Sequence, residues 1–404
     1  AEARSRLRDL VSFQPLTGFA EWRHGYRTLS DANQDSMSIG ATRLQVESEA
    51  SAGPTVFNMV VDLLYDYERA EHDVFLEEGR GWLDIRKLNV LYTPPPFPFM
   101  DIKAGRQILT WGTGDLIFIN DLFPKDWQSF FIGRDTAYLK APSDAIKVAV
   151  YNRDVANLDI IYTPRFDADR FVDGTRLSFW DLFSQSPIGV EKPDNWVDDD
   201  EIAARLHRII NGYETALYFY DGFWKIPRGA MPATGEYTFP ELRVYGASVR
   251  GPVGPGIGYV ETGYYDAKED RDGTNPFIPN SELRFLVGYQ YELAQDFKTT
   301  VQYYVKKMMD FSAYERSFLN AFTPRTRPRF NDVKHAFTLR LTKLLLQQNL
   351  ELSFFTRFST TTDDAYFKPR ASYKVSDRWT VECGGNFFAG EEPWTFLGQF
   401  ARND

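Results

Sequence analysis

Residues 282–292 read Glu-Leu-Arg-Phe-Leu-Val-Gly-Tyr-Gln-Tyr-Glu, a stretch in which apolar or aromatic residues alternate with polar ones. Side chains in a β-strand point alternately to its two faces. This stretch therefore predicts a strand with one apolar face and one charged face. The same alternation occurs at residues 55–68 and 332–342. By itself the alternation fits a soluble β-sandwich as well as a membrane barrel.

Two features favour the membrane barrel. Tyr, Phe and Trp crowd the apolar face near the strand ends, as in the aromatic girdles of outer-membrane barrels, and the segments are about ten residues long, enough to cross the hydrocarbon layer at a tilt. The 404 residues are 43% hydrophobic and 16% aromatic but contain no uninterrupted apolar run of helix-spanning length. We therefore predict an all-β fold, a transmembrane antiparallel up-and-down β-barrel.

The alternation can be followed through 17 segments. The expected strands cover residues 16–27, 37–49, 55–68, 81–92, 99–110, 143–151, 157–164, 201–210, 213–222, 241–251, 256–266, 282–293, 297–308, 332–342, 349–358, 365–375 and 378–388. Connections after even-numbered strands are tight, and those after odd-numbered strands tend to be longer. Bacterial barrels have short periplasmic turns and long extracellular loops. We therefore expect a periplasmic N-terminus in the bacterial outer membrane.

Strand number and chain organisation follow from the same pattern. Bacterial single-chain barrels usually have an even number of strands. Because residues 390–404 read as an extracellular loop, we expect 18 strands with the closing strand beyond Asp404; 16 strands is the alternative. Residues 1–13 are expected to be a periplasmic segment, with a short amphipathic helix at residues 4–11, and the start Ala-Glu-Ala suggests that a signal peptide has been removed. Residues 14–404 lack an evident linker and are expected to form a single barrel.

A hairpin near the N-terminal end carries a family resemblance. Residues 83–92 (LDIRKLNVLY) precede a proline-rich turn, and residues 102–112 (IKAGRQILTWG) follow it. The pair resembles the hairpin of alginate-export-type porins and their uncharacterised relatives, in which a Gly-Arg-Gln segment is followed by Trp-Gly. The resemblance implies a barrel that conducts a hydrophilic solute or polymer. It also makes Arg106 and Gln107 candidates for the lumen or its constriction, although Arg106 could equally brace a neighbouring carboxylate such as Asp84 or Asp101.

The polar faces of the late strands are rich in bases. If these faces line the lumen, they form a cationic arc despite a net charge of −10, because the local field decides selectivity. The members of the arc are Arg284, Lys298, Lys306, Lys334, Arg340, Arg357, Lys368, Arg370 and Lys374. We expect a preference for anionic or polyhydroxylated solutes. The alternative is that neighbouring acids neutralise these bases and leave little selectivity.

Two connections, residues 112–141 and 165–200, are long and rich in Phe, Trp and Asp. Long loops are usually functional or disordered. Five aromatic residues of the first loop are candidates for a constriction or a sugar-stacking surface if the loop folds inward: Phe118, Phe123, Trp127, Phe130 and Phe131. The alternative is a compact external cap.

These observations predict a passive outer-membrane channel in contact with lipid and lipopolysaccharide. The alternative is a barrel that serves as a scaffold or sheath for a periplasmic or surface partner. A hydrolase is less expected, because the four histidines show no paired metal spacing and no Gly-x-Ser-x-Gly motif occurs. We expect no catalytic residue, metal or cofactor. The acidic balance also argues against nucleic-acid binding.

Overall fold

The fold is described from a computed structural model. It describes residues 11–30, 34–67, 73–77, 79–174, 176–179, 190–321, 330–392 and 395–403. The amphipathic helix expected at residues 4–11 lies almost wholly outside these ranges. Within them, no helix combines the length and the apolar character needed to cross a membrane.

One large sheet contains 19 strands. They are β1 (Ser12–Phe13), β2 (Thr17–Tyr26), β3 (Met37–Ala52), β4 (Thr55–Asp66), β7 (Leu83–Tyr92), β8 (Met100–Ile108), β9 (Pro142–Val150), β10 (Asn157–Thr163), β12 (Glu201–Ile210), β13 (Tyr213–Phe223), β16 (Glu241–Val253), β17 (Gly256–Ala267), β18 (Glu282–Ala294), β19 (Phe297–Met308), β20 (Val333–Leu345), β21 (Leu350–Ser359), β22 (Ala365–Lys374), β23 (Thr380–Gly384) and β24 (Phe387–Ala389). Each pairs antiparallel with its neighbours in the chain, except at two interrupted edges.

At those edges, β1 and β2 both pair with β3, and β23 and β24 both pair with β22. The sheet therefore has 17 strand positions within the described residues, and they confirm the 17 expected segments. The last segment, residues 378–388, differs in being broken between β23 and β24. An ion pair of 3.6 Å between Arg23 of β2 and Glu382 of β23 joins the two edge strands. The expected eighteenth strand stays a prediction.

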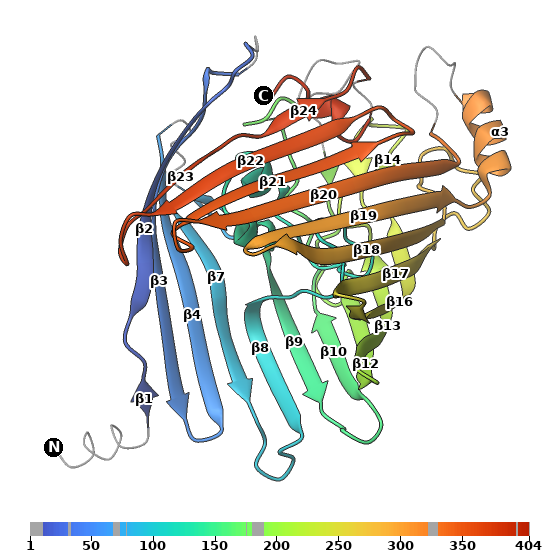
Figure 1. The fold of residues 1–404 in the computed structure, drawn as a ribbon. Helices are drawn as coiled ribbons and strands as arrows, with labels where there is room; N and C mark the ends of the chain where they lie inside the picture. The colour runs from blue at the N-terminus through green and yellow to red at the C-terminus, as the bar shows by residue number, and fades with distance from the viewer. Residues whose placement is uncertain are drawn as a thin grey trace.

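The connections alternate as expected. The tight ones are residues 53–54, 93–99, 151–156, 211–212, 254–255, 295–296, 346–349 and 375–379. We call this end of the sheet the short-turn end and the opposite end the long-loop end. Figure 1 shows β1 and several tight turns at the lower end, with α3 and the C-terminus at the loop end. Strand direction changes gradually, from near-vertical at β3 to near-horizontal at β20, as the twist of a sheet requires.

The long connections contain short elements of their own. These are β5 (Val74–Phe75), β6 (Arg80–Gly81), α2 (Trp127–Phe131), η1 (Thr136–Leu139), β11 (Val190–Glu191), β14 (Gly229–Ala230), β15 (Tyr237–Thr238), α3 (Phe311–Ala321) and η2 (Gly398–Phe400). They connect and cover the long-loop end without adding to the main sheet.

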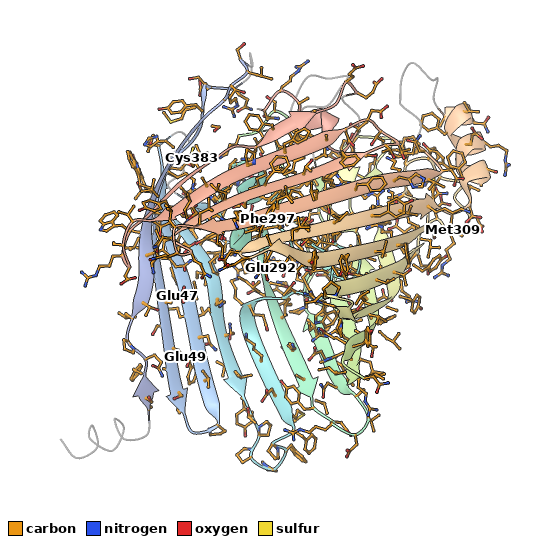
Figure 2. The ribbon with its side chains drawn as sticks, viewed as in Figure 1. Glu47, Glu49, Glu292, Phe297, Met309 and Cys383 are labelled. Atoms are coloured by element: carbon orange, nitrogen blue, oxygen red, sulfur yellow. The ribbon has the colours of Figure 1, made fainter. Side chains whose placement is uncertain are left out.

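The two faces of the sheet differ as the alternation predicts. On β18, Leu283 is 44% exposed on the outward face, whereas Glu282 is 1% exposed on the inward face. The inward phase also continues along β3, where Glu47 and Glu49 lie toward the short-turn end (Figure 2). The exposed apolar face suits hydrocarbon, and the inward face, which we call the lumen wall, carries the charges.

We expect Val287→Arg to destabilise the barrel by about 2–4 kcal/mol, because Val287 lies mid-strand on the exposed apolar face and a charge there must enter hydrocarbon. Urea unfolding in lipid vesicles, followed by tryptophan fluorescence, would measure the cost. Val253→Arg, at the short-turn end of β16 on the same face, is the matched control and should cost about 1 kcal/mol or less. Equal costs at the two depths would argue against a membrane-spanning face.

Candidate functional site: the lumen wall and its inner loop

Residues 109–141, which connect β8 to β9, fold onto the lumen wall; we call them the inner loop. Phe123, Phe130 and Phe131 are all at least 95% buried. Phe131 packs against Tyr366 and Phe388 of the wall, with ring centroids 5.8 and 5.2 Å apart. Of the two arrangements left open by the sequence, the loop thus adopts the inward one.

A single buried carboxylate holds the inner loop against the opposite wall. Glu261 on β17 is 1% exposed and accepts hydrogen bonds from the backbone N–H groups of Thr113, Gly114 and Asn120 at 2.7, 3.1 and 2.8 Å, and from the Thr113 hydroxyl at 2.9 Å. Bonds from N–H groups to an ionised carboxylate are among the stronger hydrogen bonds in proteins. A Cβ at Gly112, where φ is +79°, would lie 2.8 Å from Glu261 Oε1, so the approach requires glycine.

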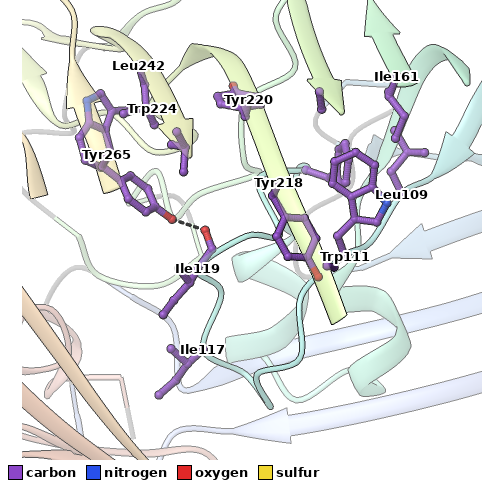
Figure 3. Close-up of a cluster of buried hydrophobic side chains, with 14 of the residues drawn as sticks. Leu109, Trp111, Ile117, Ile119, Ile161, Tyr218, Tyr220, Trp224, Leu242 and Tyr265 are labelled. Carbon is purple, nitrogen blue, oxygen red and sulfur yellow. Dashed lines mark hydrogen bonds between the residues drawn. The ribbon is translucent and has the colours of Figure 1, made fainter. Parts of the chain in front are cut away.

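Neighbouring strands add further attachments. Gln302 of β19 accepts from the Asp115 N–H and donates to the Asp115 carbonyl, both at 2.7 Å. Arg340 of β20 makes two bonds to the Asp115 carboxylate, at 2.5 and 2.8 Å. The Tyr265 hydroxyl donates to the Ile119 carbonyl (Figure 3). Residues 113–120 therefore cross the lumen from β8 to β17–β20 at about mid-strand depth.

Apolar packing reinforces these bonds. Trp111, Ile117 and Ile119 of the inner loop pack with inward residues of the wall, including Tyr218 and Tyr265, in one buried cluster (Figure 3). The Trp111 and Tyr218 ring centroids are 6.0 Å apart. Burial of large aromatic and aliphatic side chains contributes roughly 1.5–3 kcal/mol each. The segment is consequently a fixed part of the lumen.

The other side of the inner loop rests on a charged part of the early wall. Tyr138 lies between the guanidinium groups of Arg43 and Arg86, which are 3.8 and 4.7 Å from its ring centroid. Arg43 pairs with Asp62 at 3.0 Å, and Gln45 donates to both Asp62 and the Tyr138 hydroxyl. Arg86 lies 3.9 Å from Asp84 and donates to the Lys140 carbonyl at 2.7 Å, so each charge of this group has an oppositely charged neighbour, as buried charges require.

Within the inner loop, Asp121 lies between two lysines. Its carboxylate pairs with Lys125 at 3.0 Å and also with Lys140. Burial alone would raise the pKa of Asp121, but the two ammonium groups hold it below its ordinary value. Asp121 is therefore an ionised, structural carboxylate.

The second long connection, residues 164–200, packs on the inner loop. Arg170 pairs with Asp84 at 3.2 Å and with Asp126 at 3.4 Å. Asp169 accepts from the Lys125 N–H at 2.9 Å and from Trp127 Nε1 at 2.8 Å. Burial raises the pKa of Asp169 to about 6, against the opposing influence of Lys125. Residues 175 and 180–189 of this connection lie outside the described ranges.

A cavity of about 850 Å³ opens between these loops and the β17–β22 wall at the long-loop end. One side is apolar and is formed mainly by half-buried side chains of the loops: Leu116, Phe118, Trp127, Phe171, Phe179 and Phe396. The other side is cationic and is formed by Arg228, Arg284, Lys306, Lys334 and Arg357, with Glu282 and Asp364 as its acids. The rest of the lining adds three bases and three acids: Lys125, Lys225, Arg402, Asp121, Asp169 and Glu391. Among described residues, no three His, Cys, Asp or Glu side chains are placed to hold a metal ion.

The cationic arc expected from the sequence is partly neutralised. Arg284 and Lys306 share Glu282 with Arg228, at 2.6, 2.8 and 2.9 Å. The remaining partners are Asp115 for Arg340, Asp135 and Glu382 for Arg370, Asp377 for Lys374, and the Phe130 carbonyl and ring for Lys368. Lys298 lies exposed near the short-turn end. Lys334 and Arg357 have no carboxylate partner within the described residues.

Of the two alternatives for Arg106, the structure supports the bracing of a carboxylate and not a place in the lumen, whereas Gln107 faces inward. Arg106 is the cross-strand partner of Leu88 and Asp144 on the outward face, and it bonds Asp144 at 2.7 and 3.0 Å. Gln107 is 1% exposed on the inward face and donates to the Ala145 carbonyl. Adjacent residues in a strand face opposite ways, so only one of the two can reach the lumen.

Three inward lysines lie near the short-turn end of the early wall. Lys103 and Lys147 are direct cross-strand partners on β8 and β9, and Lys87 on β7 faces the same side. Lys147 also lies 3.4 Å from Asp159. The phase of Lys87 is hidden in the sequence, because a bulge in β7 reverses the alternation after Ile85. Like charges placed directly opposite destabilise a sheet.

No protein-family model matches the chain, and no curated protein does. Among solved structures, Pseudomonas aeruginosa OccK5 matches with a TM-score of 0.51 and 7% identity, over 94% of this chain and 92% of that one. The fold is that of a porin-type barrel. Acinetobacter baumannii DcaP (TM-score 0.43, 10% identity, 94% of this chain and 98% of that one) and Salmonella typhi OmpF (TM-score 0.47, 12% identity, 94% and 99%) also match.

We expect Glu261→Gln to release residues 113–120 from the wall. Any orientation of the amide places an NH₂ group against at least one N–H donor, and each buried group left without a partner costs about 1–3 kcal/mol. Amide hydrogen exchange at Thr113, Gly114 and Asn120 should accelerate. Glu214→Gln, an exposed position on β13, is the control and should leave these amides unchanged. Unaltered exchange in Glu261→Gln would contradict the anchoring role.

Asp169 predicts a pH dependence. Its pKa is about 6 in the folded protein and about 3.8 in the unfolded chain, so the folded state binds the proton more tightly between these values. Its contribution to stability is therefore greatest below pH 3.8 and is lost as pH rises through 6. Compared with Asp169→Asn, the wild type should gain stability as pH falls from 7.5 to 5 in urea titrations. Parallel pH profiles for the two proteins would contradict this.

Proposed function

We propose that this protein is a passive channel of the bacterial outer membrane for hydrophilic solutes, with a preference for anions. The porin-type fold supports a membrane-spanning barrel, and the charged lumen wall supports a polar path through it. The observation that carries the proposal is the cationic surplus beside the cavity, whose lining within the described residues contains eight Lys and Arg side chains and five Asp and Glu side chains. A local excess of one charge attracts counter-ions regardless of net charge.

Cations at both ends of the lumen support the direction of this preference. Lys334 and Arg357 lie near the long-loop end and have no carboxylate partner in the part of the chain that the structure describes. Lys87, Lys103 and Lys147 lie near the short-turn end. Placing Lys103 opposite Lys147 weakens the sheet. An anion that passes between the two ammonium groups would offset their repulsion. Anion passage would therefore explain why two lysines face each other at this position.

The proposed orientation places the short turns and the N-terminal segment in the periplasm and the long loops outside, next to lipopolysaccharide. Short periplasmic turns are general in bacterial barrels. With the exposed native Cys383 replaced by serine, a cysteine introduced at Gly254, in one of the tight turns, should react with an impermeant maleimide in spheroplasts with a ruptured outer membrane but not in intact cells. Labelling in intact cells would reverse the orientation.

Passage of a polymer, the finer implication of the resemblance to alginate-export-type porins, would require room beside the anchored inner loop. A scaffold role would require a lumen blocked or occupied by a partner. Liposome swelling with monosaccharides and with oligouronates separates these possibilities. Swelling with both supports polymer passage, swelling with monosaccharides alone limits the channel to small solutes, and no swelling together with a co-purifying partner favours the scaffold.

In planar bilayers with a KCl gradient, we expect the reversal potential to have the sign of chloride selectivity. Lys103→Gln combined with Lys147→Gln should move it toward zero, because two inward charges are removed. Lys343→Gln removes an outward-phase lysine of β20 and should leave the potential unchanged. Clear potassium selectivity of the wild type would contradict the proposed preference.

A further inference from the structure

The cavity at the long-loop end combines two chemistries that a channel for plain hydrophilic ions does not need. Its loop side presents a continuous aromatic surface. The ring centroid of Trp127 lies 6.1 Å from those of Phe118 and Phe396 and 5.8 Å from that of Phe131. Trp127, Phe118 and Phe396 are only half-buried. Their uncovered surface faces the cavity, where it would be hydrated without an occupant.

The opposite side presents cations with unused bonding capacity. Arg228, Arg284 and Lys306 are all engaged by Glu282. Arg357 differs, because its Nη1 atom is buried and has no hydrogen-bond partner. A buried guanidinium N–H without an acceptor is costly. Lys334 also lacks an ion pair within the described residues. Of the five bases on this side of the cavity, these two are therefore the ones available to an anion.

The two sides meet at one point. The Arg357 guanidinium carbon lies 5.1 Å from the centroid of the Phe396 ring, and Phe396 continues the aromatic surface to Trp127. A guanidinium binds a carboxylate through two parallel hydrogen bonds. A ligand whose carboxylate reaches Arg357 would thus place its adjoining atoms against the aromatic side chains. The cavity volume of about 850 Å³ is within the range of sites for small organic ligands.

We propose that this cavity binds an aromatic carboxylate, with the carboxylate on Arg357 and Lys334 and the ring on Phe118, Trp127 and Phe396. The inference rests on the proposed channel function and narrows its solute class from anions in general to anions with a flat apolar body. A polyhydroxylated solute suits the site less well, because the aromatic side offers few hydrogen-bonding groups and the cationic side favours negative charge.

Isothermal titration calorimetry on the purified full chain in detergent tests this, with 3-phenylpropionate as the probe. Acetate carries only the charge, 3-phenylpropanol only the ring, and glucose neither. We expect 3-phenylpropionate to bind at least tenfold more tightly than each of the other three. Equal affinity for 3-phenylpropionate and acetate, or for 3-phenylpropionate and 3-phenylpropanol, would overturn the proposal. This comparison uses only the wild-type protein, so it does not depend on the folding of any variant.

Variants then locate the two halves of the site. Arg357→Met and Lys334→Met should each weaken 3-phenylpropionate at least tenfold while leaving 3-phenylpropanol unchanged, whereas Phe396→Ala should weaken both. Lys307→Met, an exposed outward lysine on β19, is the matched control and should change neither. Unchanged binding of 3-phenylpropionate in both Arg357→Met and Lys334→Met would overturn the assignment. Heat-modifiable gel mobility would confirm that each variant is folded.

Conductance distinguishes the failure of this inference from the failure of the proposed function. An anion-selective channel that fails to bind 3-phenylpropionate would overturn the aromatic-carboxylate site alone. Binding of 3-phenylpropionate by a barrel that conducts no ions would overturn the channel and keep the binding site. In a conducting channel that binds the probe, 3-phenylpropionate should reduce the chloride current and acetate should not.

Discussion

The antiparallel hydrogen-bond ladder from β2 to β24 is the constraint on which the rest of this protein depends. Backbone groups within hydrocarbon find no water to bond, so each strand of a membrane barrel must be satisfied by its neighbours. The ladder fixes the two-residue alternation of side chains and thereby separates an apolar outward face from a charged lumen wall. The inner loop packs on the inward face that this separation defines.

The buried charged groups of the lumen wall need hydrogen-bond or ion-pair partners, and the inner loop supplies many of them. Glu261 satisfies donors of the loop backbone, and Arg340 and Gln302 bind the Asp115 region, so wall and loop stabilise each other. The same logic holds on the early strands, where Tyr138 lies between two arginines. The inner loop is therefore held by polar contacts whose strength depends on exclusion of water, together with buried aromatic packing.

The distribution of charge in the lumen matters more than its total. Most bases of the late strands are matched by acids, some of them contributed by loops far away in the sequence. Arg357 and Lys334 stand apart because no carboxylate forms an ion pair with them within the described residues, and they face an aromatic surface. A net-negative protein can therefore hold a cationic path, since short-range fields inside a low-dielectric lumen decide which ions are favoured.

The sequence by itself determined the strand positions, the alternation of short and long connections and the inward phase of residues such as Lys306 and Arg357, because these follow from the two-residue repeat of an extended chain. It could not show that Arg106 bonds Asp144, 38 residues further along the chain, nor place Lys87, whose phase depends on a bulge. Only the tertiary structure decided that residues 113–120 cross the lumen. It also decided which bases form ion pairs with carboxylates of the described residues and which do not. Those outcomes depend on contacts between residues more than a hundred positions apart, such as Glu261 with Thr113, and no local pattern encodes them.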